Sequence, residues 1–252
     1  MRLLRVCAGA ALLLWLGMGP AGAGDFRLLR LGNSIVKWGQ PQFGIGAVIT
    51  YAFATRPRHF GSARNCRALD PFHAFSGASG IAMPTLALEF EQALASWERV
   101  ANVRFRHVED GATANILVGA QAEPRGYAFA NVVPAGAGAA ERATTGPADA
   151  ASPAERSSPG PHAREPSRIV PIEQSVICLN PDRPWKVGFD GNTEVYDLRY
   201  TFAHEIGHAL GLDHPGASGE LMSFRYGEEF RTPQNGDGEG AAMLYGRMPR
   251  VD

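Results

Sequence analysis

Thr201–Gly216 reads TFAHEIGHALGLDHPG and holds three of the seven histidines in the chain. His204 and His208 are four residues apart, and a four-residue step in a helix places two side chains on one face, about one turn apart. At that spacing, two imidazole nitrogens can bind one zinc ion at about 2.0–2.1 Å. Two such histidines are often an ordinary surface pair, but here the stretch also has the apolar face of a packed helix. The pattern therefore predicts a metal site on a helix.

Gly211 explains how a third histidine reaches the same metal ion. A helix that continued past Leu210 would carry His214 away, whereas glycine adopts the left-handed conformation that ends a helix and turns the chain back. His214 then becomes the third ligand, and three protein ligands leave one position for water, as in catalytic zinc sites. Glu205 follows the first ligand, so we expect its carboxylate to take a proton from the zinc-bound water without binding the metal.

Residues 1–23 predict a secretory signal peptide. Two arginines precede an apolar run at 6–18, and the AGA sequence at 21–23 fits a small-x-small cleavage site. An uncleaved membrane anchor is the alternative, but the run is shorter than the roughly 20 residues that span a bilayer. We therefore expect a mature protein that is secreted or periplasmic and has no membrane anchor.

The composition is that of a globular protein, and the charge excludes some classes of partner. Hydrophobic residues make up 45% of the 252 residues and charged residues 19%, so the chain can bury a sizeable core. Without the signal peptide, 22 basic and 25 acidic residues leave a net charge of −3. This balance gives no reason to expect binding to nucleic acid or to an anionic membrane surface.

Two cysteines, Cys66 and Cys178, remain after removal of the signal peptide. An even number of cysteines in an oxidising compartment favours one disulfide. Its loop would span roughly a hundred residues, which corresponds to about 4–5 kcal/mol of stabilisation. Two separate buried thiols are the alternative, because the sequence alone does not show that the sulfur atoms meet.

Strands and helices are predicted on both sides of a long polar segment. Runs of β-branched and aromatic residues predict strands at 47–55, 103–108, 114–120, 126–133 and near 175–179. Apolar residues at three- and four-residue steps predict an amphipathic helix over 84–103, with Pro84 in its first turn. A second helix is expected to end at Gly211, and Asp237 favours the start of a short third one. We expect residues 65–77 to form a loop.

Residues 135–168 predict a disordered insertion. From Ala135 to Arg168 the chain has no Val, Ile, Leu, Met, Phe, Tyr or Trp, so it cannot bury enough apolar area to offset the entropy lost on ordering. A linker between two domains is the alternative. The part after the segment is short and the part before it has no evident chemistry, so we expect one domain over 24–252.

The sequence HEIGHALGLDH resembles the long zinc signature of the metzincin metalloendopeptidases. Met222, eight residues after His214, is similar in position to the methionine in the turn beneath the metal of the matrixins. Pro215 is instead typical of the serralysins. The final GDGEGAAMLYG resembles the closing helix of both groups, and weaker similarity extends over most of residues 45–247.

The resemblance implies an α+β, zincin-like fold. Its parts would be a twisted, mixed five-stranded sheet, two long helices, a zinc cleft and a small C-terminal subdomain that ends in a short helix. It implies an endopeptidase with one catalytic zinc ion, which binds an extended peptide along the edge strand at 126–133. We expect the secreted protein to be a monomer. A zinc-binding interaction protein that has lost turnover is the alternative, and Glu205 argues against it because only catalysis needs that carboxylate.

Several features depart from the two groups. We find no matrixin-type cysteine switch and no His-x-Asp pair for a second zinc, and the roughly twenty residues after the signal peptide leave little room for an inhibitory propeptide. Calcium is compatible with the resemblance, but no loop motif supports it. Serralysins have a metal-binding tyrosine where this chain has Phe224. Tyr226 is the nearby candidate for stabilising a transition state, with packing as the favoured alternative.

Overall fold

The computed structural model describes residues 25–61, 63, 65–136, 168–216 and 219–249. The predicted signal peptide at 1–23 and nearly all of the predicted insertion at 135–168 lie outside the described residues. Within the described part, no helix has the length and apolar character that crossing a bilayer requires.

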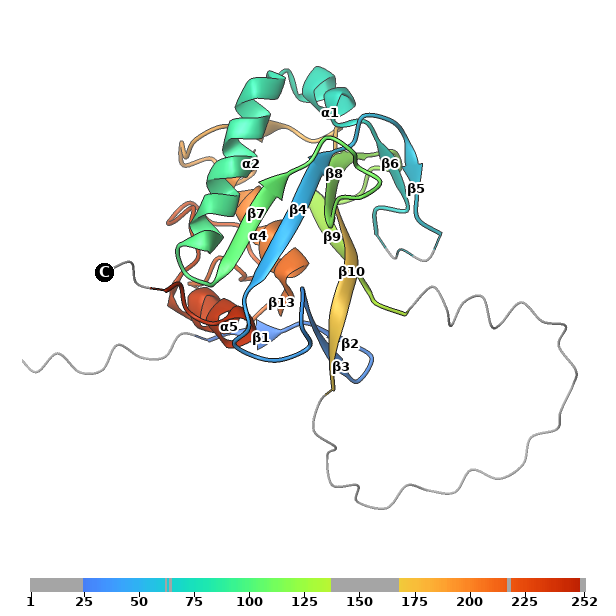
Figure 1. Cartoon of the computed structure of the whole chain (residues 1–252). Coiled ribbons are helices and arrows are strands. Elements are labelled where there is room, and N and C mark those ends of the chain that lie inside the picture. The colour runs from blue at the N-terminus through green and yellow to red at the C-terminus, as the bar shows by residue number, and fades with distance from the viewer. Residues whose placement is uncertain (1–24, 62, 64, 137–167, 217–218, 250–252) are drawn as a thin grey trace, which may run out of the picture.

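Five strands form the mixed sheet that the resemblance implies (Figure 1). Four of them are parallel and lie in the order β7 (Val103–His107), β4 (Ala47–Phe53), β8 (Ile116–Gln121) and β10 (Arg168–Leu179). β9 (Ala128–Pro134) runs antiparallel to β10 along its other side. Among the described residues β10 is the only partner of β9, so β9 is an edge strand.

The sheet is larger than predicted, with nine strands among the described residues. β3 (Ser34–Lys37) is parallel to the first half of β10, and β2 (Arg30–Leu31) is antiparallel to β3. At the C-terminal end of β8, β6 (Ala68–Asp70) pairs antiparallel with β8, and β5 (Arg58–His59) pairs antiparallel with β6. These strands have two to four residues, too few for an alternating pattern to be recognised.

The prediction of a loop at 65–77 was wrong. The segment contains β6 and the start of α1 (Phe72–Ser79), a helix that ends at Gly80 in the left-handed conformation. Phe72 and Phe75 are buried, and the ring of Phe72 stacks on that of Phe53 with centroids 4.8 Å apart. With only two large apolar residues, this eight-residue helix has too little periodicity to be predicted.

Helices α2 (Met83–Glu98) and α4 (Leu198–Leu210) share one large apolar core with one face of the sheet. The buried residues of α2 follow the predicted three- and four-residue spacing, and Pro84 lies in its first turn. Trp97 of α2 is fully buried, and its indole Nε1 donates to the carbonyl oxygen of Ala203 in α4 at 2.8 Å. The two long helices are therefore fixed to each other directly.

A smaller core lies on the opposite side of the sheet and contains the disulfide. Cys66 and Cys178 are joined, with Cα atoms 5.8 Å apart, as the even cysteine count led us to expect. Cys178 lies in β10, so the bond attaches the segment between β5 and β6 to the centre of the sheet.

The remaining elements include two short strand pairs, one at each end of α4, and a closing helix. β1 (Arg27–Leu28) pairs antiparallel with β13 (Leu212–Asp213), and β11 (Trp185–Lys186) pairs parallel with β12 (Tyr196–Asp197). The closing helix α5 (Asn235–Tyr245) begins with a capping box formed by Gln234 and Asp237. Asp237 thus acts at the helix start, as predicted.

Candidate metal centre

Helix α4 is fixed at both ends, which positions the residues between them. At its start the side chain of Asp197 accepts a hydrogen bond from the amide of Tyr200 at 2.9 Å. At its end Gly211 has a φ of 101°, as the sequence predicted. A Cβ atom at Gly211 would also lie 2.2 Å from the carbonyl oxygen of Val36, so the close approach of β3 requires glycine as well.

The Nε2 atoms of the three predicted ligands converge. Nε2 of His214 lies 3.1 Å from that of His204 and 3.2 Å from that of His208. In a tetrahedral site with zinc–nitrogen distances of about 2.0–2.1 Å, ligand nitrogens are about 3.3 Å apart. The three histidines therefore fit a zinc ion. Among the described residues, they form the one cluster of three or more histidine, cysteine, aspartate or glutamate side chains that could hold a metal ion.

Two backbone carbonyls orient the helical ligands. His204 Nδ1 lies 2.8 Å from the carbonyl oxygen of Leu221, and His208 Nδ1 lies 2.9 Å from that of Leu212. Donation from Nδ1 leaves the lone pair of each Nε2 free for a metal. Burial and the neighbouring imidazoles lower the pKa of His204 to about 3 and that of His208 to about 4, so both rings are neutral, as metal ligation requires.

Glu205 has a carboxylate oxygen that no group of the protein satisfies. Its Oε2 is buried and has no hydrogen-bond partner, whereas the carboxylate accepts a hydrogen bond from the backbone of Ala130 in β9. Burial raises the pKa of Glu205 to about 8. A buried oxygen without a partner is costly, so its position beside the histidines indicates a partner supplied by a bound molecule.

The turn at Met222 is held by α5. The amides of Leu221 and Met222 donate to the two carboxylate oxygens of Asp237, at 2.7 and 3.0 Å. Leu221 also supplies the carbonyl that orients His204, so Asp237 acts on a ligand through this turn. Met222 is buried, and Gly207 of α4 provides the space for it. The sequence indicated Met222 and Asp237 separately but not their connection.

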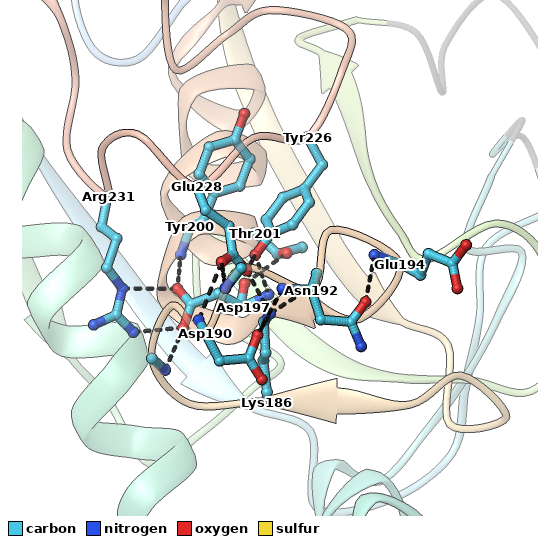
Figure 2. A network of polar contacts seen from close by, with 12 residues as sticks. Lys186, Asp190, Asn192, Glu194, Asp197, Tyr200, Thr201, Tyr226, Glu228 and Arg231 are labelled. Carbon is cyan, nitrogen blue, oxygen red and sulfur yellow. Dashed lines mark hydrogen bonds and ion pairs between the residues drawn. The ribbon is translucent and has the colours of Figure 1, made fainter.

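The hydroxyl of Tyr226 points into a polar network (Figure 2). The hydroxyl accepts from the amide of Asp197 at 3.0 Å and donates to Glu228 Oε1 at 2.9 Å. Lys186 forms ion pairs with Glu228 and Asp190 in the same network. These contacts give Tyr226 a structural part, so its role in the transition state stays a prediction.

The same network fixes the start of α4. The guanidinium of Arg231 pairs with the fully buried carboxylate of Asp197 at 2.6 Å (Figure 2). The same guanidinium pairs with Glu89 of α2 at 3.3 Å. Arg199 pairs with Glu89 at 2.7 Å. These charges are widely separated in the chain, and no local pattern predicted that they meet.

A cleft of about 760 Å³ runs past the histidines between α4 and the edge strand β9. The carbonyl of Tyr127 accepts a hydrogen bond from the amide of Asn180, so the backbone groups of Tyr127 point towards β10. Because the direction alternates along a strand, the backbone groups of Ala128, Ala130 and Val132 point away from β10, to the open edge. The contact of Ala130 with Glu205 agrees with this alternation. Further side chains that the sequence did not indicate also border the cleft: Leu29, Leu31, Tyr127, Tyr196 and Tyr200.

The part of the chain that contains this site matches a known protein family. The family model described as Matrixin matches residues 161–246, which include the three histidines, the turn at Met222 and α5. The chain carries a matrixin-like metzincin domain. The matrixin family is one of zinc metallopeptidases, and the histidine cluster fits the zinc ion that the family implies. The elements β4, α2, β7, β8 and β9 precede the matched range and share the sheet and the core with the matched elements.

Proposed function

We propose that this chain is a secreted zinc-dependent endopeptidase that hydrolyses peptide bonds with Glu205 as its general base. One observation carries the proposal. The three convergent imidazole nitrogens lie beside a buried, unpaired carboxylate oxygen, in a cleft that is bordered by an open strand edge. A site for structural zinc would need no such oxygen and no such cleft.

The edge of β9 would bind the substrate as an added strand. An extended polypeptide can pair with the outward backbone groups of Ala128 and Val132 and with the carbonyl of Ala130, whose N–H donates to Glu205, and these bonds are independent of the substrate side chains. Pairing fixes the depth and direction of the peptide in the cleft, so that one peptide carbonyl lies next to the histidines and Glu205.

Glu205 would move the proton that hydrolysis requires. Bound to His204, His208 and His214, zinc would polarise the scissile carbonyl and make water more acidic. Oε2 of Glu205 accepts the proton of the attacking water and then delivers it to the leaving amine. The contact with Ala130 holds the carboxylate at the edge strand, and therefore close to the peptide that the strand binds.

The remaining expectations from the sequence stand as proposals. We propose cleavage of the signal peptide after residue 23, a single catalytic domain over 24–252 that acts as a monomer, and a disordered insertion at 135–168. The disulfide supports export, because such bonds persist in oxidising compartments.

The test of this function is hydrolysis of casein by purified protein comprising residues 24–252. Glu205→Gln removes the general base with little change in shape, so we expect kcat/KM to fall by about 10²–10⁴-fold. The zinc content should remain one ion per chain, because Glu205 is not a ligand. Glu109→Gln removes a carboxylate from an exposed turn and should leave both quantities unchanged.

Two outcomes would contradict the proposal in different ways. Full activity of the Glu205→Gln variant would disprove the role of the general base. Absence of cleavage by wild type, with zinc bound, would favour a non-catalytic zinc-binding interaction protein descended from a metzincin.

A further inference from the structure

The N-terminal segment forms a wall of the cleft at one end of β9. Leu29 and Leu31 border the cleft together with Val132, Val133 and Pro134, the last residues of β9. Pro134 pairs with Ile172 of β10. The residues of β10 just before Ile172 pair with β3, and β3 in turn pairs with β2. The tyrosines border the other end, because Tyr127 directly precedes β9.

Backbone hydrogen bonds attach this segment to the strand that precedes His214. Arg27 and Leu28 of β1 pair with Asp213 and Leu212 of β13, and the amide of Leu29 donates to the carbonyl oxygen of Gly211 at 2.8 Å. The guanidinium of Arg27 also pairs with the carboxylate of Asp213 at 3.1 Å. The position of Leu29 is therefore set by the same short strand that leads to a zinc ligand.

Packing against α5 makes the segment an integral part of the domain. A Cβ atom at Gly236 would lie 2.3 Å from the carbonyl oxygen of Asp25, and one at Gly240 would lie 3.0 Å from the ring of Phe26. Farther along, the fully buried ammonium of Lys37 donates to three backbone carbonyls. Residues 25–37 therefore pack closely against the rest of the domain.

We propose that Leu29 and Leu31 form an apolar subsite that selects apolar substrate side chains on the N-terminal side of the scissile bond. The inference rests on the proposed peptidase function. A substrate antiparallel to β9 has its N-terminal half next to Val132–Pro134, where the two leucines face the cleft. Close to this wall, the charges of Arg27 and Asp213 pair with each other, and Arg30, which lies between the two leucines in the chain, is exposed to solvent.

Apolar contact of this kind changes specificity by a predictable amount. A hydrophobic pocket discriminates by roughly 10–200-fold between side chains that fill it and those that do not. Leucine in the substrate would remove water from Leu29 and Leu31, whereas aspartate would lose its own hydration there without gaining a partner.

The test begins with the cleavage sites of casein, which mass spectrometry of the products identifies. For one such site, two synthetic peptides are compared that differ only in leucine or aspartate at the second or third position before the cleaved bond. We expect wild type to prefer the leucine peptide by at least about tenfold in kcat/KM. Leu29→Ala/Leu31→Ala should remove most of this preference, with the zinc content unchanged. Leu88→Ala, on the outer side of α2 where Leu88 is 51% exposed, is the matched control.

A second variant keeps the inference testable if the double variant does not fold. Leu31 lies in the short strand β2 and is only partly buried, so Leu31→Arg adds a charge at the cleft wall. This variant should raise kcat/KM for the aspartate peptide and lower it for the leucine peptide. Unchanged ratios in both folded variants would overturn the subsite and leave the peptidase function intact. Absence of any cleavage by wild type would overturn the peptidase function, and the subsite with it.

Discussion

At the scale of single residues, Gly207 shows how closely the helix and the turn beneath it approach. A Cβ atom at Gly207 would lie 2.2 Å from Sδ of Met222 and 2.8 Å from Cζ2 of Trp97. Both neighbours are buried, so neither can move without disturbing the core. Gly207 therefore lets Met222 pack directly against α4.

We predict that Gly207→Ala destabilises the protein. Overpacking costs about 1–3 kcal/mol, and the better helix propensity of alanine returns up to about 1 kcal/mol. The net loss of unfolding free energy, up to about 2 kcal/mol, can be measured by urea denaturation of the zinc-loaded protein. Gly77→Ala in α1 has open space around its new methyl group and should be neutral or stabilising. Equal effects at the two glycines would show that the contact with Met222 is unimportant.

At the scale of elements, α5 influences the metal site without touching it. Asp237 caps α5, accepts from the amides of Leu221 and Met222, and so fixes the carbonyl that orients His204. One carboxylate thus connects the start of a helix, a turn and a predicted zinc ligand. Residues that orient ligands in this way commonly change metal affinity by 10–100-fold when they are replaced.

We predict that Asp237→Asn weakens zinc binding. Leu221 and Met222 donate to different oxygens of Asp237, so asparagine would place its NH₂ group against one of these two backbone N–H groups and lose that hydrogen bond. Zinc affinity, measured by competition with a chromophoric chelator, should fall by about 10–100-fold. Glu239→Gln removes the same charge from the same helix but none of these hydrogen bonds, and its affinity should stay at the wild-type value. A similar loss in both variants would mean that charge, not orientation, matters.

At the scale of the whole molecule, the disulfide joins two parts of the fold that lie far apart in the sequence. Cys66 and Cys178 are separated by 112 residues, and the enclosed chain includes α1, α2 and the strands β7, β8 and β9. It also includes the predicted insertion at 135–168, which adds to the length of the loop. A cross-link over so long a loop restricts the unfolded chain strongly.

We predict that Cys66→Ser/Cys178→Ser lowers the unfolding free energy by about 4–5 kcal/mol, the value that chain entropy gives for a loop of this length. Urea denaturation of the oxidised wild type and of the double variant measures the difference. A reducing agent should destabilise the wild type by a similar amount and leave the variant unchanged. If reduction has no effect on wild type, the disulfide does not contribute to stability in this way.

Local patterns predicted the central strands and long helices because each of these elements has several residues with regular spacing. The strand at 47–55 became β4, and the strand near 175–179 lies within the longer β10. The two-residue strands β1, β2 and β13 could not be predicted, since only hydrogen bonds to distant partners define them. The same holds for Arg231, which meets Asp197 and Glu89 only in the folded chain.

The predicted zinc ligands and the proposed general base follow from the sequence by itself, because His204, Glu205 and His208 share one helix and Gly211 turns His214 back towards it. Only the tertiary structure decided how these residues are oriented and what surrounds them. The carbonyl of Leu221, the contact of Ala130 with Glu205, and the leucine wall come from distant segments. Spacing within one segment sets which atoms can bind a metal, whereas long-range pairing sets which side chains border the peptide beside it.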